Sequence, residues 1–204
     1  MTPEQVLRLN GNLHDSEMMN IVRRFHAFAQ AHGLPYCVVG GMAVVRNGYP
    51  RTTIDVDILT YKNDWEKLRP VSADIEISGP ESCVDKKTGV TIDILFADDD
   101  WQMVMAMPDP RAAAEYDESF GASFMGLYPL VQLKAAVYLS KLAEQGDNVA
   151  AKDRGDVFEL IKRNIEKFSD DVINGFHPAV RKHCVTAYND ALKAIAREKK
   201  GRRG

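Results

Sequence analysis

The stretch from Val38 to Leu59 reads V-V-G-G-M-A-V-V-R-N-G-Y-P-R-T-T-I-D-V-D-I-L, and the rest of the chain is organised around it. An apolar run ends at Gly40-Gly41, and a β-branched, alternating run closes the stretch around Asp55 and Asp57. The closing run predicts a strand. Because strand side chains alternate between faces, the two carboxylates should share one face, about 6–7 Å apart at the backbone.

Two carboxylates at this spacing indicate a site for a divalent cation, because bare desolvated charges repel and a hard cation relieves the repulsion. An isolated D-x-D pattern is weak, since Asp is common at exposed strand ends. The run Val90–Phe96 adds Asp93 in the middle of a second apolar strand. An acid there is costly unless it is paired or metal-bound. We therefore predict that Asp93 lies on a neighbouring strand and joins Asp55 and Asp57 in one cluster.

Four motifs follow one another along the chain: Gly40-Gly41, Arg51-Thr52-Thr53, Asp55-x-Asp57 and Asp93. In these motifs the chain resembles the nucleotidyltransferase (polymerase β-like) superfamily. The longer pattern G-G-M-A…G-Y-P-R-T-T-I-D-V-D-I-L is most similar to the AbiE-type (AbiEii) abortive-infection nucleotidyltransferases and their toxin relatives. The resemblance covers about residues 36–160, by motif and not by continuous similarity.

The resemblance implies a chemistry for the acidic cluster. Asp55, Asp57 and Asp93 would hold Mg²⁺, or Mn²⁺ in its place, and the substrate would be a nucleoside triphosphate. An acceptor hydroxyl would attack the α-phosphorus, Asp93 would be able to act as general base, and pyrophosphate would leave.

The residues around the cluster have two interpretations each. Gly40 and Gly41 would let phosphate approach the backbone, or they form a tight turn without a ligand. Arg51, Thr52 and Thr53 would contact phosphate or ribose, although Arg51 could equally be a structural partner for an acid.

The helical pattern that begins at Pro129 contains a further candidate, Lys134. A lone lysine beside an apolar stripe usually extends to solvent, whereas the resemblance implies that it holds the triphosphate. Downstream, Lys152-Asp153-x-x-Asp156 resembles the late K-D-x-x-D motif of the family. Asp153 and Asp156 lie three residues apart, hence on one helix face, and without the resemblance they would be ordinary first-turn charges.

The predicted fold class is α+β: a nucleotidyltransferase-fold mixed sheet flanked by helices, with a C-terminal helical bundle. Residues 1–120 would form the catalytic core and residues 121–204 a helical subdomain that completes the nucleotide site. The predicted elements are helices over 3–9, 16–32, 41–47, 64–69, 101–107, 129–145, 152–167 and 178–197, and strands over 36–39, 54–59, 73–78, 82–85 and 90–96. Lys86–Gly89 predicts a hairpin turn.

Composition is ordinary for a globular protein, with 45% hydrophobic and 27% charged residues among 204. No apolar run approaches the ~20 residues that span a bilayer, and the N-terminus lacks a signal-peptide pattern. Cys37, Cys83 and Cys184 are odd in number and widely spaced, which predicts buried free thiols in a reducing compartment. We therefore expect a cytoplasmic protein without a membrane partner.

Charge is unevenly spread: residues 1–120 carry a net −8 and residues 121–204 a net +5. This division suits a polyanionic substrate bridged by cations, and solvated helix faces explain it equally well. The resemblance implies RNA as acceptor, often the tRNA 3′ end, and a cognate antitoxin protein as partner. The alternative acceptors are a small molecule such as an aminoglycoside and a protein hydroxyl. The alternative to an enzyme is a non-catalytic nucleotide-binding regulatory module, and the three retained carboxylates argue against it.

Overall fold

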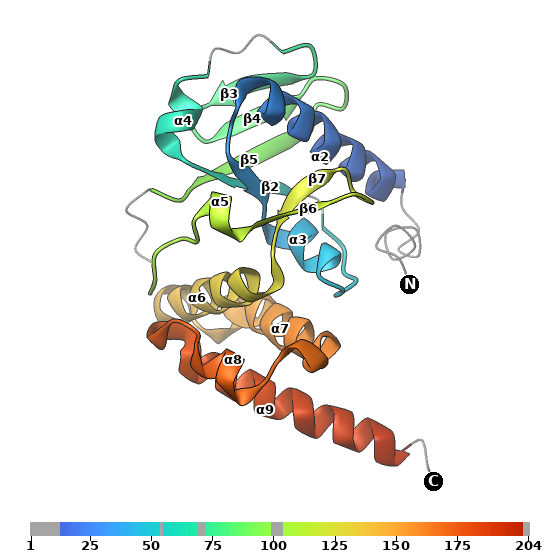
Figure 1. The fold of residues 1–204 in the computed structure, drawn as a ribbon, viewed down its shortest axis with the longest axis vertical. Coiled ribbons are helices and arrows are strands. Elements are labelled where there is room, and N and C mark those ends of the chain that lie inside the picture. The colour runs from blue at the N-terminus through green and yellow to red at the C-terminus, as the bar shows by residue number, and fades with distance from the viewer. Residues whose placement is uncertain (1–12, 54, 69–71, 99–103, 202–204) are drawn as a thin grey trace. The chain divides into compact units, whose positions relative to one another are not determined.

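The computed structural model describes four stretches of the chain: residues 13–53, 55–68, 72–98 and 104–201. These residues form two compact units (Figure 1). The sheet unit consists of the described residues within 1–100 and 107–126, and the helical unit of those within 101–106 and 127–204. The predicted α+β class is confirmed, because a mixed sheet flanked by helices is followed by a set of C-terminal helices.

The sheet unit is built around one seven-stranded sheet with the strand order β3-β4-β5-β2-β1-β7-β6. Its elements, in chain order, are α2 (Leu13–His32), β1 (Tyr36–Val38), α3 (Gly40–Arg46), β2 (Val56–Thr60), α4 (Lys62–Glu66), β3 (Ile75–Gly79), β4 (Ser82–Asp85), β5 (Thr91–Phe96), α5 (Pro110–Ala113), β6 (Ala114–Asp117) and β7 (Ala122–Met125). The pairs β1–β7 and β2–β5 are parallel, and the other neighbours are antiparallel. The predicted hairpin between β4 and β5 is confirmed.

One face of the sheet forms the core beneath α2 (Figure 1). The ring of Phe25 in α2 lies 5.2 Å from that of Tyr36 in β1. Val38 is two residues further along β1 and is in register with Ile58, which in turn is in register with Ile94. Residues in register share a face, so all of these buried side chains point toward α2. The alternate residues of the central strands therefore point to the opposite face.

The predicted helix over 101–107 is wrong in its described part, because Val104–Met107 adopt bends and irregular backbone. Residues 101–103 lie outside the described residues, as does the short helix predicted over 3–9. Pro108 follows directly, and a residue that precedes proline is disfavoured in the α-helical region.

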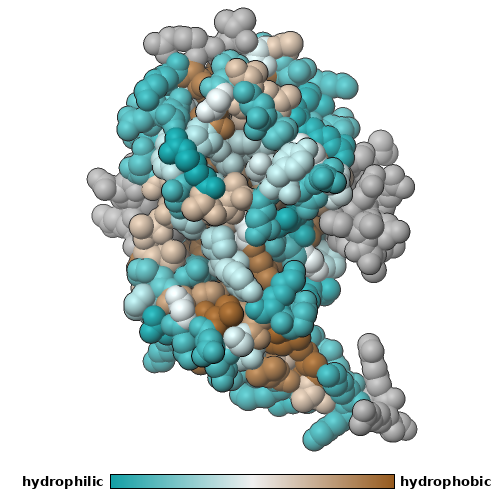
Figure 2. All heavy atoms as spheres, viewed as in Figure 1, coloured by the Kyte–Doolittle hydropathy of each residue, from teal (hydrophilic) through white to brown (hydrophobic). Residues whose placement is uncertain are grey.

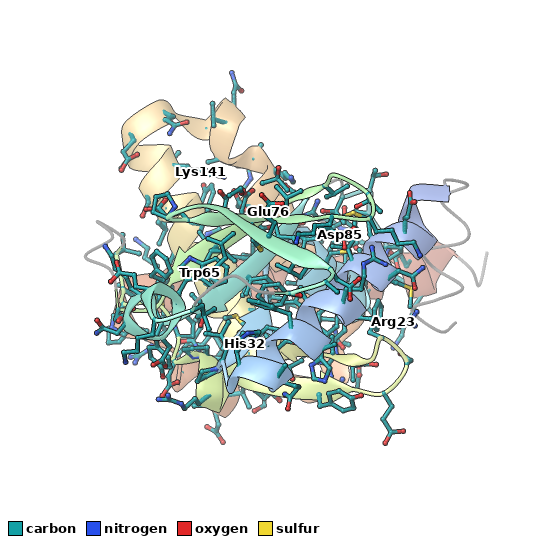
Figure 3. All side chains as sticks on the ribbon, turned by 90° about the horizontal axis from the view of Figure 1, so that it is seen from above. Arg23, His32, Trp65, Glu76, Asp85 and Lys141 are labelled. Carbon is teal, nitrogen blue, oxygen red and sulfur yellow. The ribbon has the colours of Figure 1, made fainter. Side chains whose placement is uncertain are left out.

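A buried carboxylate ties the β4–β5 hairpin to α2. The fully buried side chain of Asp85 accepts a hydrogen bond from Arg24 Nη2 at 2.8 Å and another from Thr88 Oγ1 at 2.6 Å. Figure 3 shows Asp85 close to α2, which carries Arg24. Burial raises the pKa of Asp85, but the hydrogen bonds from Arg24 and Thr88 outweigh it and hold the pKa below its usual range.

We expect Asp85→Asn to lower the free energy of unfolding by about 3 kcal/mol at pH 7, because Arg24 is left beside a neutral amide. The folded-state pKa of Asp85 lies below its unfolded value. Its contribution is therefore fully present above about pH 4 and declines as pH falls further. Chemical denaturation at pH 7 and pH 3 should thus give a smaller difference between wild type and variant at pH 3. A difference that does not depend on pH would contradict this assignment.

The helical unit contains α6 (Leu127–Gln145), α7 (Asp147–Arg163), the 3₁₀ turn η1 (Ile165–Lys167), α8 (Asp170–Asn174) and α9 (Pro178–Gly201). Apolar side chains from the three long helices form its core, among them Leu130, Val131, Val157, Leu160, Ile161, Val180 and Cys184. Hydrophobic side chains also reach the surface of the helical unit, as Figure 2 shows. The large exposed ones include Leu142, Val149 and Leu192.

The three cysteines are free and buried, as predicted. Burial raises the pKa of Cys37, Cys83 and Cys184 to about 12, so each is a protonated thiol at neutral pH. In the described stretches, no helix is long and apolar enough to cross a membrane.

Candidate functional site

Two of the predicted carboxylates are direct neighbours across the parallel pair β2–β5. Asp57 of β2 is in register with Asp93 of β5, on the sheet face opposite to α2. Neighbouring strands lie about 4.8 Å apart, so the two side chains emerge side by side. Asp57 is half-buried and Asp93 is exposed. The structure therefore brings together the two carboxylates that the sequence placed on separate strands.

The third carboxylate, Asp55, directly precedes β2 and is held by its own loop. The buried Thr53 hydroxyl donates a hydrogen bond to Asp55 Oδ1 at 2.6 Å. Thr53 therefore orients an acid, and its predicted contact with phosphate or ribose stays a prediction. Asp55 and Asp57 are two residues apart: Asp57 lies against Gly40, and Asp55 is bonded to Thr53, which lies against Gly41.

Gly40 and Gly41 leave the space that these side chains occupy. Gly40 has φ 57°, and a Cβ on it would lie 1.7 Å from Asp57 Oδ2. A Cβ on Gly41 would lie 2.2 Å from Thr53 Oγ1 and 3.0 Å from Arg51 Nη2. Neither position can carry a side chain without displacing the motif. Because Gly40 and Gly41 have no side chains, the segment that carries Asp55 and Asp57 can pack against the β1–α3 turn. The role of the two glycines in binding phosphate stays a prediction.

We expect Gly40→Ala to disturb the site far more than Gly89→Ala, which is a matched control. Both glycines have positive φ, so both variants carry about 1–2 kcal/mol of backbone strain. A Cβ at Gly89 meets nothing within 4 Å, whereas one at Gly40 collides with Asp57. Gly40→Ala should therefore lower the free energy of unfolding by about 1–3 kcal/mol more than Gly89→Ala, because an overpacked site must shift. Denaturation curves of both variants test this, and equal stabilities of the pair would contradict it.

Arg51 and Thr52 lie at the rim of this group. Arg51 is half-buried, Thr52 is exposed, and Arg51 Nη1 donates a hydrogen bond to the Thr52 carbonyl oxygen at 3.1 Å. Arg51 Nη2 also lies beside Gly41. The Arg51 guanidinium and the Thr53 hydroxyl therefore both face Gly41.

The donor chemistry of the acidic residues fits a hard cation, because carboxylate oxygens are the ligands that Mg²⁺ prefers. Among the residues described, no three His, Cys, Asp or Glu side chains are arranged as a group that could hold a metal ion. Mg²⁺ does not require such a cage, since it is usually bound by one or two carboxylates together with waters and substrate phosphates. The register pair of Asp57 and Asp93 meets that smaller requirement.

Lys134, Asp153 and Asp156 form a separate cluster inside the helical unit. Lys134 Nζ lies 3.0 Å from Asp153 Oδ1 and 3.0 Å from Asp156 Oδ2, and all three side chains are buried. The interpretation of Lys134 as a lysine that extends to solvent is therefore wrong. The ion pairs join α6 to α7. The role on a triphosphate that the resemblance implies for Lys134, Asp153 and Asp156 stays a prediction.

A fourth residue, Lys141, completes this cluster and was not predicted. Its Nζ lies 2.7 Å from Asp153 Oδ2. Burial raises the pKa of Asp153, but Lys134 and Lys141 outweigh it and hold the pKa below its usual range. The signal was available, because Lys134 and Lys141 are seven residues apart and so share one helix face.

Two comparisons with known proteins add no relative. No protein-family model matches the chain, and no curated protein matches it either.

Proposed function

We propose that the chain is a Mg²⁺-dependent nucleotidyltransferase, which moves a nucleoside monophosphate from a nucleoside triphosphate to an acceptor hydroxyl. The observation that carries this proposal is the register pair of Asp57 and Asp93, next to the turn at Gly40 and Gly41. Asp55 adds a third carboxylate at the entrance to the same strand. The order of these residues along the chain is that of the nucleotidyltransferase motifs, and Asp57 and Asp93 lie on neighbouring strands, as the resemblance leads one to expect.

The acidic residues divide the chemistry between them. Asp57 and Asp93 would hold the cation, which when bound neutralises triphosphate charge and lowers the pKa of the acceptor hydroxyl, and Asp55 stays a predicted third ligand. Asp93 is the most exposed of the three, so it is best placed to accept the proton of the acceptor hydroxyl. As the acceptor oxygen bonds to the α-phosphorus, the bond to the bridging oxygen of pyrophosphate breaks and pyrophosphate leaves.

Arg51 and Thr52 supply the groups at the rim. The Arg51 guanidinium is permanently charged and suits a phosphate, and the exposed Thr52 hydroxyl can bond to phosphate or ribose. Thr53 acts through Asp55, which it orients by its hydrogen bond.

The test is incubation of the full chain with each α-³²P-labelled nucleoside triphosphate, Mg²⁺ and one acceptor at a time. Total RNA, an aminoglycoside and the protein itself are the three acceptors. We expect label in one acceptor, with stoichiometric pyrophosphate, and none when EDTA is present. Nucleotide binding without pyrophosphate release in any mixture would replace this proposal with a non-catalytic nucleotide-binding module. Absence of both binding and release would overturn the proposal altogether.

A further inference from the structure

Helix α9 carries a row of exposed cations, and we infer that this row binds the sugar–phosphate backbone of a nucleic acid. The row, termed the basic stripe, consists of Lys182, Thr186, Asn189, Lys193, Arg197 and Lys200, all of which are exposed. Their spacings of three and four residues place them on one side of the helix.

The basic stripe keeps a net positive charge, because only one of the two acids of α9 lies beside it. Glu198 lies on a different side of the helix and accepts a hydrogen bond from Lys162 of α7 at 2.6 Å. Asp190 flanks the stripe and pairs with Lys193 at 3.1 Å, but both side chains are more than half exposed. Exposed pairs of this kind are weak and screened by salt, so Lys193 remains available to a polyanion.

Helix α7 shows what a merely solvated helix surface looks like in the same unit. Its exposed Arg154 pairs with Asp147 at 3.1 Å, and Arg163 pairs with Glu159 at 2.9 Å. Cations and anions therefore alternate on α7 and offset one another. The basic stripe carries four cations with neutral Thr186 and Asn189 between them, and Asp190 is the one acid beside it, so a net positive charge remains that attracts phosphate.

The dimensions and side chains of the stripe favour a nucleic-acid backbone as its partner. From Lys182 to Lys200 the helix rises about 27 Å, which matches about eight base pairs of duplex at about 3.4 Å each. Thr and Asn side chains bond to phosphate and sugar oxygens in such complexes. The stripe has no aromatic side chain on which a base could stack, so binding should be independent of sequence.

An anionic membrane fits the helix less well. Interfacial helices insert an apolar face, but the apolar side of α9 is used in the core of the unit, where Val180, Cys184, Ala187 and Ala191 are buried. Outside that core, Leu192 is the large hydrophobic side chain that α9 exposes, and a single such residue does not form an apolar face that could enter a bilayer along the helix.

If α9 binds a nucleic acid, nucleic acids would be the acceptor class for nucleotidyl transfer. Only this connection between binding and transfer rests on the proposed function. The binding itself is measured without any nucleotide or turnover. A failure of the stripe would therefore leave transfer intact, and a failure of transfer would leave binding intact.

The experiment is fluorescence anisotropy of the full chain with a fluorescein-labelled 20-nucleotide RNA of mixed sequence, and with a duplex of the same length, between 50 and 200 mM salt. The double variant Lys193→Gln/Lys200→Gln removes two stripe charges. The double variant Lys87→Gln/Lys167→Gln removes two exposed charges outside α9. Far-UV circular dichroism checks that both remain folded.

We expect the stripe variant to bind RNA at least about tenfold more weakly than wild type at 50 mM salt. The slope of log K against log salt should fall by about 1.4 for the single strand. The control variant should stay within about twofold of wild type. If both variants weaken RNA binding equally, the overall charge of the protein and not the basic stripe explains the binding, and the inference is overturned. Absence of binding, or tighter binding to phosphatidylserine vesicles than to either nucleic acid, would also overturn it.

Discussion

Replacing Asp57 by Asn is expected to reduce nucleotidyl transfer by about 1,000-fold or more, which corresponds to about 4 kcal/mol of transition-state stabilisation. The amide keeps the shape of the side chain but removes the charge next to Asp93, its register partner. Asp93→Asn should have an effect of the same order. Both variants should stay folded, because Asp57 is only half-buried and Asp93 is exposed.

The matched control is Glu76→Gln, which removes an exposed carboxylate from the edge strand β3. It should transfer nucleotide at the wild-type rate. The measurement is kcat/KM with the preferred triphosphate, together with a denaturation curve for each variant. If Asp57→Asn keeps more than about a tenth of wild-type activity while folded, Asp57 is not part of the reacting site.

Replacing Lys134 by Met is expected to lower the free energy of unfolding by about 3–5 kcal/mol, because Asp153 and Asp156 would be left buried without this cation. Lys141 still reaches Asp153, but it is partly exposed and does not replace the buried ammonium. Lys193→Met is the control, since its pair with Asp190 lies at the surface and should contribute at most about 1 kcal/mol.

A triple variant separates the cost of leaving buried carboxylates unpaired from the cost of losing side-chain packing at the same place. Lys134→Met with Asp153→Leu and Asp156→Leu replaces the cluster by apolar side chains of similar size. It should recover most of the stability lost in the single variant. Urea denaturation of all these variants gives the comparison. A Lys134→Met protein within about 1 kcal/mol of wild type would show that the cluster does not stabilise the helical unit.

The central strands of the fold were predictable because their sequences carry local signals. β2 and β5 alternate and are rich in β-branched residues, and turn residues bound the hairpin before β5. β6 and β7 were not predicted. The sequences Ala114–Asp117 and Ala122–Met125 contain no β-branched residue, so they lack that strand signal. The two strands pair with each other in a hairpin, and β7 also pairs with β1, a distant contact that no local pattern reports.

The candidate site was predictable in its composition but not in its register. D-x-D and the acid inside a second apolar strand indicate three carboxylates on two strands, yet only the pairing of β2 with β5 makes Asp57 and Asp93 direct neighbours. For Lys134, the usual behaviour of a lysine beside an apolar stripe predicts exposure to solvent, and this prediction was wrong. Its partner acids lie on the next helix, and the sequence around Lys134 carries no signal of that packing.

Binding of the α,β-methylene analogues of the four nucleoside triphosphates, measured by isothermal titration calorimetry with and without Mg²⁺, tests the acidic cluster most directly. We predict that wild type binds at least one analogue only when Mg²⁺ is present, and that Asp57→Asn/Asp93→Asn loses this dependence together with the binding. Equal affinities with and without Mg²⁺, or a double variant that binds like wild type, would contradict the assignment of these carboxylates to a cation-assisted triphosphate site.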